Sequence, residues 1–170
     1  MIIMLAVVNV NPRWGIGNEN RLLAHIRADM RRFRSLTTGN AIIIGRKTLD
    51  TFPNGKPLPN RENLILTHDP DFSAESAVIC HTLEELFSVV KDRDPDSVFV
   101  CGGEQIYRQL LPYCSKAFVT LTYSDAKADR YFPNLNQLPN WILTEVGEKQ
   151  YENNIGFRFL MYTNTDVQPF

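Results

Sequence analysis

The chain has 170 residues, of which 44% are hydrophobic and 22% are charged, proportions ordinary for a soluble globular protein. Its 18 Lys and Arg residues against 19 Asp and Glu residues give a net charge of −1. No dense basic stretch is present, so nucleic acid is not expected as a partner. The length and composition exclude disordered, collagen-like and disulfide-scaffold proteins and predict a single domain over residues 1–170.

No membrane, metal or disulfide is expected either. The longest apolar run, residues 1–8, is too short to span a bilayer and lacks the basic segment of a signal peptide. Cys80, Cys101 and Cys114 have no CxxC spacing, which is typical of reduced thiols in a cytoplasmic protein. No cluster of His, Cys or Asp has metal-ligand spacing. We therefore expect a cytoplasmic protein that binds no metal.

Predicted strands and helices alternate over the first two thirds of the chain. Runs rich in Ile and Val predict buried strands at residues 1–10, 41–45, 63–67, 77–80 and 97–101. Helical spacing predicts helices at residues 29–36, 83–90 and 104–111. Gly39 and Pro112 mark the ends of the first and third helices. This alternation is typical of a parallel sheet covered by helices.

Two helices carry further signals. In the first, the apolar face is expected to contain Met30, Phe33 and Leu36, and the side chains expected to face outward are Arg31, Arg32 and Arg34. In the second, Thr82 and Glu85 have the spacing of a capping box. The first signal predicts which side of the helix meets the sheet, and the second predicts where the other helix begins.

The pattern changes after Pro112. Strands are predicted at residues 116–124, 142–149 and 157–163, with no long helix between them. The expected fold is therefore α/β, with a mostly parallel central sheet, antiparallel C-terminal edge strands and flanking helices. Such a sheet binds ligands beyond the carboxyl ends of its strands, where the strand order reverses.

The segment 11–26 follows the first strand and contains Gly15-Ile16-Gly17. This run is similar to the start of a dinucleotide-binding fingerprint, but Asn20 stands where the third glycine is required. A long loop with two glycines beside a site favours a mobile lid. An ordinary surface connection is the alternative.

Asp29 lies at the predicted start of the first helix, just after Leu22, Leu23 and Ile26. An acidic residue there stabilises the helix by complementing its dipole, which is one explanation for the presence of Asp29. The other is a functional carboxylate, held against an apolar cleft, that accepts two N–H bonds from an amidine-like heterocycle and helps to protonate it.

Two glycine-containing turns follow strands and precede helices. Gly45 is followed by Arg46 and Lys47, and Gly102-Gly103 precedes the third helix. Such turns let backbone N–H groups approach an anion closely, and cations at the first turn add charge. A solvated helix start and a structural tight turn are the respective alternatives.

Taken together, these segments resemble dihydrofolate reductase in order and spacing, over nearly the whole chain. The matching motifs are Gly15-Ile16-Gly17, Asp29 with Phe33, Ile44-Gly45-Arg46-Lys47-Thr48, Pro57-Leu58-Pro59-Asn60-Arg61, Val100-Cys101-Gly102-Gly103, Thr120 and Asp129-Arg130-Tyr131-Phe132-Pro133. The resemblance implies an α/β oxidoreductase that reduces 7,8-dihydrofolate to tetrahydrofolate by hydride transfer from NADPH. It also implies dihydrofolate and folate-like small molecules as ligands, and we expect a monomer with no nucleic-acid or membrane partner.

The resemblance implies roles for residues on the substrate side. Asp29 resembles the carboxylate that bonds the pterin N3 and 2-amino group and promotes protonation at N5, with Thr120 as its hydroxyl partner. Arg61 matches the arginine that forks onto the glutamate α-carboxylate of the substrate. The substrate-binding residues implied are Leu5, Asp29, Met30, Phe33, Leu58, Arg61 and Thr120.

On the cofactor side, Arg46, Lys47 and Thr48 match the element that holds the adenosine 2′-phosphate and pyrophosphate, which favours NADPH over NADH. Gly102 and Gly103 match a double glycine joined by a cis peptide. The cofactor-binding residues implied are Val7, Ile16, Gly17, Asn20, Gly45, Arg46, Lys47, Thr48, Thr67, His68, Gly102, Gly103, Glu104, Gln105, Ile106 and Tyr107.

One position departs from the family pattern. Ala24 stands where the family usually has a Trp that orders a water beside the carboxylate, so a proton route through that water is in question. His25, next to it, is either a substitute or a bystander. Two other functions stay open: an NADPH-dependent reductase of a riboflavin-pathway pyrimidine, and a non-catalytic paralogue that binds pterin or nucleotide.

Overall fold

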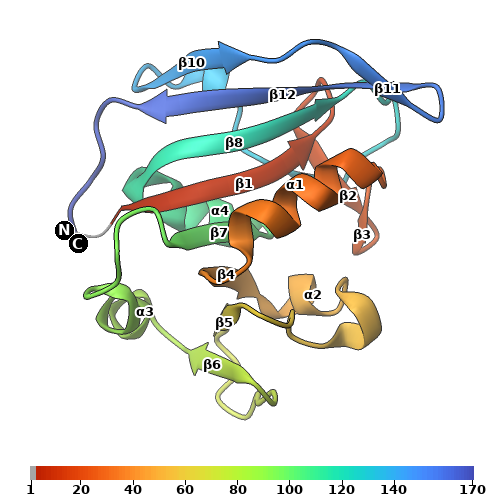
Figure 1. Cartoon of the computed structure of the whole chain (residues 1–170). Helices are drawn as coiled ribbons and strands as arrows, with labels where there is room; N and C mark the ends of the chain where they lie inside the picture. The colour runs from red at the N-terminus through yellow and green to blue at the C-terminus, as the bar shows by residue number, and fades with distance from the viewer. Residues whose placement is uncertain (1–2) are drawn as a thin grey trace.

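The computed structural model describes residues 3–170 and shows a twisted sheet with helices on both faces (Figure 1). Within these residues the main sheet has nine strands. In sheet order they are β10 (Trp141–Val146), β12 (Ile155–Asn164), β8 (Cys114–Thr122), β1 (Met4–Val10), β7 (Val98–Gly102), β4 (Ala41–Gly45), β5 (Glu62–Leu66) and β6 (Ala77–Cys80), with β11 (Gln150–Glu152) also paired to β12. The helices are α1 (Arg27–Thr37), α2 (Arg46–Leu49), α3 (Leu83–Val90) and α4 (Glu104–Leu110), with 3-10 turns η1 (Pro53–Gly55), η2 (Leu111–Tyr113) and η3 (Leu135–Gln137).

The strand directions confirm the predicted architecture. β1 pairs in parallel with β7 and with β8, and β4 pairs in parallel with β5 and with β7. β12 runs antiparallel to β8 and to β10. The chain passes from β1 to β4 and returns to insert β7 between them, so the strand order reverses beside β1. The carboxyl ends of β1, β4 and β7 are therefore where a ligand site is expected.

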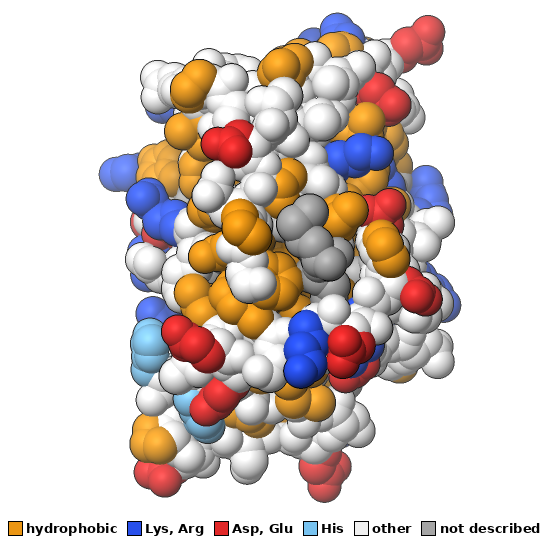
Figure 2. Space-filling view, turned by 90° about the vertical axis from the view of Figure 1, so that its left-hand side faces the viewer, with side chains coloured by type: hydrophobic (Ala, Val, Ile, Leu, Met, Phe, Trp, Pro, Cys, Tyr) orange, Lys and Arg blue, Asp and Glu red, His pale blue; other side chains and the backbone are white. Residues whose placement is uncertain are grey.

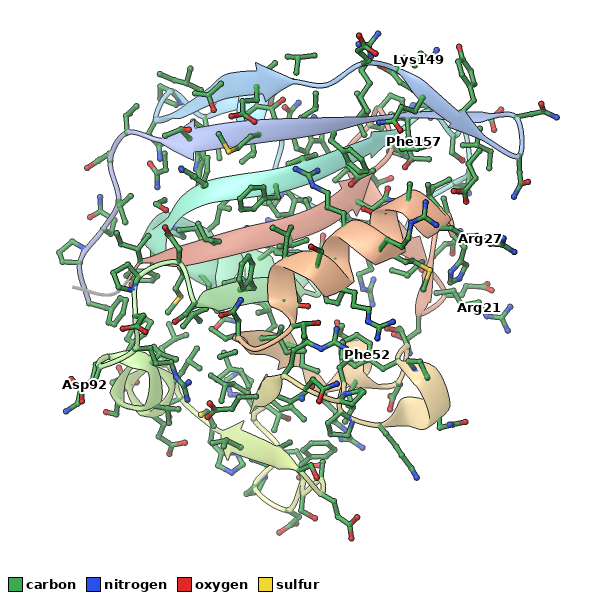
Figure 3. All side chains as sticks on the ribbon, viewed as in Figure 1. Arg21, Arg27, Phe52, Asp92, Lys149 and Phe157 are labelled. Atoms are coloured by element: carbon green, nitrogen blue, oxygen red, sulfur yellow. The ribbon has the colours of Figure 1, made fainter. Side chains whose placement is uncertain are left out.

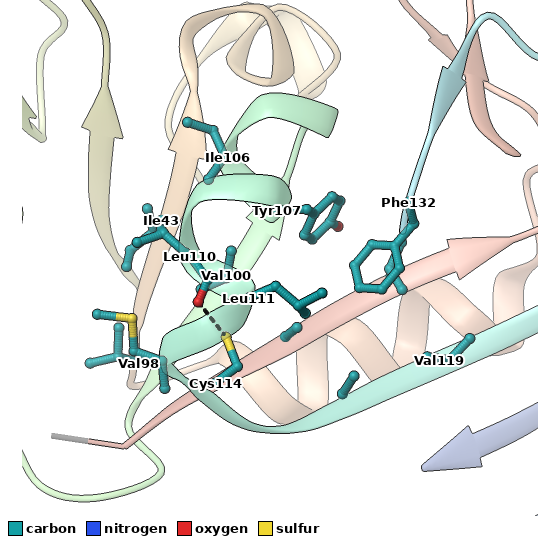
Figure 4. Close-up of a cluster of buried hydrophobic side chains, with 14 of the residues drawn as sticks. Ile43, Val98, Val100, Ile106, Tyr107, Leu110, Leu111, Cys114, Val119 and Phe132 are labelled. Carbon is teal, nitrogen blue, oxygen red and sulfur yellow. Dashed lines mark hydrogen bonds between the residues drawn. The ribbon is translucent and has the colours of Figure 1, made fainter. Parts of the chain in front are cut away.

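Alternation along β1 divides the core between the two faces of the sheet. Met4, Ala6 and Val8 pack with residues of α3 and α4 in the larger cluster. Leu5 packs in a second cluster on the α1 face, with Val7 against it. Figure 4 shows the α4 side of the core, where the buried Cys114 thiol donates to the carbonyl oxygen of Leu110 (3.4 Å). Burial raises the pKa of this thiol, so Cys114 stays protonated.

Several predicted elements differ in extent from the observed ones. The first predicted strand began at residue 1, and residues 1 and 2 lie outside the described range. α1 begins at Arg27, two residues earlier than predicted, and ends at Thr37. The Thr82 hydroxyl accepts from the Glu85 N–H (3.1 Å) as the capping box requires, while the Glu85 carboxylate accepts from the N–H of His81 (2.6 Å).

The expectation that Arg32 faces solvent is wrong. Its guanidinium lies 4.4 Å from the ring centroid of Phe159 and 5.5 Å from that of Phe118, on β12 and β8. Burial lowers the pKa of Arg32, against the opposing effect of the Asp29 and Glu145 charges. The cation–π contacts explain why an arginine occupies a face of α1 that packs on the sheet.

The segment 11–26, interpreted as a loop, contains two short strands. β2 (Gly15–Asn18) pairs with β3 (Arg21–Leu22) and with β9 (Arg130–Tyr131). The start of the 11–26 segment is anchored because Trp14 stacks on Phe132, with 6.1 Å between ring centroids. Farther along the segment, Leu22 is 53% exposed to solvent. The mobile lid stays a prediction.

The last third of the chain also carries more strands than predicted. β10 spans Trp141–Val146, shorter than the predicted 142–149, and the additional strand β11 begins at Gln150. The hairpin of β11 and β12 reaches the start of α1, where Phe157 lies above the helix (Figure 3). This hairpin therefore brings the C-terminal part of the chain to the end of the sheet where the site is expected.

The opposite end of the molecule, where the two termini lie, carries hydrophobic side chains among scattered charges (Figure 2). The ring of Phe170 stacks on that of Phe87 at 4.1 Å, and Tyr113 meets Phe87 edge-on at 5.0 Å. These contacts close the core at the end of the sheet away from the carboxyl ends of β1, β4 and β7. No helix within residues 3–170 is long and apolar enough to cross a membrane.

Candidate active site

Asp29 lies in the first turn of α1, beside the sheet, and its helix begins in an unusual way. The residue before the helix, Ile26, provides no side-chain cap. The Glu152 carboxylate, from the β11–β12 hairpin, instead accepts from the backbone N–H groups of Arg27 (2.6 Å) and Ala28 (3.2 Å). An anion at these N–H groups satisfies them and complements the helix dipole. A residue more than a hundred positions away thus fixes the turn that carries Asp29.

Both oxygens of the Asp29 carboxylate accept hydrogen bonds from the sheet. Thr120, on β8, donates its hydroxyl to Oδ1 at 2.5 Å. Asn9, on β1, donates its side-chain N–H to Oδ2 at 3.0 Å. Thr120 and Asn9 are partners in the β1–β8 register, so their side chains reach the carboxylate from adjacent strands. Two carboxylate oxygens accept about four hydrogen bonds in all, and two acceptor positions remain for a ligand.

An apolar wall adjoins this carboxylate on the α1 face of the sheet. Leu5, which is buried, packs in one cluster with the half-buried Val7, Leu58 and Phe52. Figure 3 shows Phe52 below α1. Phe33 is half-buried on α1, and Met30 is 53% exposed. Of the predicted substrate residues, Asp29 and Thr120 are in direct contact, and Leu5 and Leu58 share a cluster.

Arg61 lies at the other end of α1. Its guanidinium donates to the carbonyl oxygen of Pro59 (3.0 Å) and to the Thr37 hydroxyl (3.3 Å), which is at the last helical residue. Burial lowers the pKa of Arg61, and the nearby Arg34 lowers it further. A rise of 1.5 Å per helical residue separates Asp29 from Thr37 by about 12 Å. An anion-binding group and a carboxylate thus stand at opposite ends of one helix.

The two glycine turns lie side by side at the carboxyl ends of β4 and β7. Ile44 and Gly102 are paired in the register of these strands. A Cβ atom on Gly103 would approach the Thr48 hydroxyl to 3.3 Å, and one on Gly45 would approach Ile106 to 3.1 Å. The Gly102–Gly103 peptide is cis, as the resemblance implied. A side chain at either position would therefore crowd these neighbours, and glycine lets the two turns pack this closely.

A cavity of about 120 Å³ opens between the 11–26 segment and these turns. Of the predicted cofactor residues it contains Ile16, Gly17, Asn20, Thr48 and Tyr107. The cavity is also lined by residues that were not predicted to bind the cofactor: Val8, Asn9, Asn18, Arg21, Leu22, Thr51, Cys101 and Arg130. The cavity therefore joins the predicted lid to the strand ends, and its polar lining includes Asn9.

Tyr107 closes the inner wall of this site. Its hydroxyl donates to the carbonyl oxygen of Val7 at 2.6 Å, which ties α4 to β1 across the sheet. Burial raises the pKa of Tyr107 well above its ordinary value, and burial likewise raises that of the nearby Cys101 thiol. Both groups stay neutral at physiological pH. Val7 and Tyr107, predicted separately for the cofactor, are thus partners.

Other predicted cofactor residues lie at the rim. Arg46 forms an ion pair with Asp69 at 3.1 Å, with its side chain 54% exposed, so the pair is weak enough for a phosphate to compete. The Glu104 carboxylate accepts from the N–H of Tyr131 (3.3 Å) and so contacts the small sheet. Lys47, His68 and Gln105 are exposed as well. Thr67 is half-buried at the end of β5, where its carbonyl oxygen contacts His81 Nδ1 at 3.0 Å.

Sequence reasoning did not select Asn9, Glu152 or His81. Asn9 offered one signal: an amide inside an apolar strand whose same-face neighbours are Leu5 and Val7. Glu152 and His81 offered none, because their partners lie far away along the chain. Among the described residues no group of three or more His, Cys, Asp or Glu side chains is arranged to hold a metal.

Comparison with known proteins gives concordant matches. The sequence model of the family described as dihydrofolate reductase matches residues 1–164. The chain is 35% identical over 149 residues to the dihydrofolate reductase of Bacillus subtilis, covering 86% of each protein. It is 34% identical over 158 residues to that of Staphylococcus haemolyticus, covering 92% of each. Among solved structures, dihydrofolate reductase from Enterococcus faecalis complexed with NADP(H) superposes with a TM-score of 0.83 at 26% identity, over 96% of this chain and 97% of that one.

Proposed function

The chain belongs to the dihydrofolate reductase family and reduces 7,8-dihydrofolate to tetrahydrofolate with NADPH, and we propose that Asp29 is the carboxylate that binds the pterin and promotes its protonation. The observation that carries the proposal is the Asp29 carboxylate itself. It is fixed by Thr120 and Asn9, and it retains two free acceptor positions beside an apolar wall.

The two free acceptor positions match the pterin edge, which presents N3–H and a 2-amino group side by side. A charge-assisted pair of this kind orients the ring as well as binding it. Leu5 and Leu58 would pack on the ring system, with Phe33 and Met30 from α1. Arg61, about 12 Å along α1, would fork onto the glutamate α-carboxylate. The substrate would therefore lie along α1, with its two polar ends at the two ends of the helix.

The glycine turns fit a dinucleotide. Gly45, Gly102 and Gly103 carry no side chains, so the backbone of the two turns can approach a pyrophosphate. Arg46, Lys47 and Thr48 would hold the phosphates, and the weak Arg46–Asp69 pair would open to admit the 2′-phosphate. The rim residues Thr67, His68, Glu104 and Gln105 would contact the adenosine end. Ile16, Gly17 and Asn20 would cover the cofactor from the lid.

In the reaction, bound NADPH supplies the hydride. The chain orients the two rings, excludes water and controls one proton. Asp29, ionised, would pair with the pterin edge and stabilise the protonated ring, so that the proton required at N5 is available as the hydride arrives. Tyr107 fixes the Val7 segment of β1 through its 2.6 Å hydrogen bond, so the floor of the site does not move. The lid would close the cavity against water.

The assay that tests the function follows NADPH absorbance in the presence of dihydrofolate. We expect turnover with NADPH, weaker turnover with NADH, and none with a ribosylated pyrimidine of the riboflavin pathway. A chain that bound dihydrofolate without oxidising NADPH would instead be a non-catalytic relative. The comparisons favour neither alternative, since the matches named above are dihydrofolate reductases.

We propose further that residues 1–170 form one domain that acts as a monomer in the cytoplasm, without nucleic-acid or membrane partners. One continuous sheet runs from β10 to β6, which supports a single domain. The net charge of −1 supports the absence of a nucleic-acid partner, and the three free thiols support a reducing compartment such as the cytoplasm. Light scattering behind size-exclusion chromatography checks the monomer, and an elution mass of two chains would contradict it.

A further inference from the structure

Asn9 is a polar side chain at a strand position where its neighbours are apolar. It lies on β1, on the α1 face, two residues beyond Val7. Its Nδ2 donates to Asp29 Oδ2 at 3.0 Å, and its Oδ1 accepts from the Thr122 hydroxyl at 2.8 Å. The Thr122 side chain is buried, with 1% of the residue exposed, and has no role in the proposed binding of substrate or cofactor. The amide thus connects the candidate catalytic carboxylate to the interior of the sheet.

We propose that Asn9 is a positioning residue that fixes one oxygen of Asp29 and stabilises its ionised form. This inference rests on the proposed role of Asp29. Thr120 holds Oδ1 and Asn9 holds Oδ2, so the carboxylate cannot rotate about its Cβ–Cγ bond without losing both donors. The two remaining acceptor positions then keep a fixed direction toward the pterin edge.

The charge on Asp29 determines which way the amide points. If the amide flipped, its oxygen would face Asp29 Oδ2 at about the same 3.0 Å separation, and two acceptors would be in contact. The Thr122 hydroxyl does not oppose either orientation, because it can donate to the amide oxygen or accept from the amide nitrogen. The orientation with the amide N–H toward Asp29 is therefore the one that avoids contact between two acceptors. The N–H bond in turn favours the ionised carboxylate over the protonated one.

Asn9 also borders the cavity beneath the lid, so it lies between the carboxylate and the space that the cofactor would fill. Other charged and titratable groups act on Asp29 from the surrounding elements. Arg32 on α1 and Tyr107 on α4 both interact electrostatically with the Asp29 charge. Glu152, at the start of α1, is occupied by the N–H groups of Arg27 and Ala28. Asn9 is the neutral donor in this set, so replacing it with Ala changes a hydrogen bond and leaves the net charge unchanged.

The test is the pH dependence of hydride transfer, measured in single turnover with NADPH and dihydrofolate. For Asn9→Ala we expect the midpoint of the profile to move to higher pH, because the Asp29 carboxylate loses a donor. For Asn9→Asp, which keeps the shape and places a second carboxylate beside the first, we expect a larger upward shift. Asn140→Ala is the matched control, since it removes a side-chain amide that bonds Asn164 at 2.8 Å. Its profile should overlay that of the parent.

An Asn9→Ala profile that overlays the parent, or that moves to lower pH, overturns the inference. If loss of the Thr122 partner unfolds Asn9→Ala, two further variants carry the same test. Asn9→Asp keeps the volume, and Asn9→Ala with Thr122→Val removes both members of the inner hydrogen bond, so that the buried Thr122 hydroxyl is not left without a partner. Asp29→Asn, measured alongside, distinguishes a failure of the proposed role of Asp29 from a failure of the proposed role of Asn9. Full activity there would refute the role of Asp29, whereas lost activity with an unmoved Asn9→Ala profile would refute only the role of Asn9.

Discussion

Replacing Asp29 with Asn removes the negative charge and leaves the size of the side chain unchanged. The carbonyl oxygen of the introduced amide can still accept from the Thr120 hydroxyl, as Oδ1 of Asp29 does at 2.5 Å. The new N–H group would face the N–H of Asn9, and a flip of the Asn9 amide removes that conflict because the Thr122 hydroxyl can bond either end. The fold and NADPH binding should therefore survive the substitution.

The pterin edge, in contrast, loses its partner in the Asp29→Asn variant. It needs two acceptors, and the amide offers one acceptor and one donor, without charge. Truncating one member of a buried charge pair costs about 2–5 kcal/mol. The expected fall in kcat/KM for dihydrofolate near neutral pH is therefore between about 30-fold and several thousand-fold. Thermal melts and NADPH titration serve as controls. A folded Asp29→Asn variant with parental kcat/KM would refute the assignment.

Three further predictions follow from individual contacts. Arg61→Leu should raise the dihydrofolate Kd by about 30-fold, equivalent to about 2 kcal/mol, because the half-buried guanidinium loses its fork on the glutamate carboxylate; an unchanged Kd by fluorescence quenching contradicts this. Glu152→Ala should lower Tm by about 2–8 °C, since a lost helix cap costs about 1–2 kcal/mol, with Glu152→Gln in between; equal melts for all three proteins would show that the cap adds nothing. Ala24→Trp should leave the pH–rate profile in place, because Asp29 Oδ2 already accepts directly from Asn9; a shift as large as that of Asn9→Ala would show that an indole at this position controls protonation.

The parts of the fold that the sequence predicted are those set by local patterns. Ile- and Val-rich runs gave β4, β5 and β6 within one residue of their observed bounds, and helical spacing gave α3 without error. Gly45 and Gly102 are the last residues of β4 and β7, so the place of the glycine turns at the sheet edge follows from the topology. Local pattern and global fold agree at these positions, and agreement of that kind makes a prediction reliable.

The errors fall where a partner distant in sequence decides the structure. Helical spacing predicts Arg32 on the solvent side of its helix, but two aromatic rings from β8 and β12 favour a half-buried cation there. The 11–26 segment was interpreted as a loop because Gly15 and Gly17 are poor strand residues, yet β9 pairs with them from more than a hundred residues away. At Arg32, contacts with aromatic rings outweighed the tendency of a charged side chain to face solvent. In the 11–26 segment, pairing with a distant strand outweighed the low strand propensity of glycine.

The candidate site depends both on local sequence patterns and on contacts between residues distant in sequence. Asp29 was selected from its place before an amphipathic helix, but its geometry depends on three residues from other elements. Thr120 and Asn9 meet it from adjacent strands, and Glu152 fixes the turn that carries it. The three contacts span 20 to 125 residues along the chain, so no local pattern contains them. The type of chemistry can therefore be predicted from the sequence. The orientation of the reacting carboxylate instead depends on the β1–β8 register and on the β11–β12 hairpin.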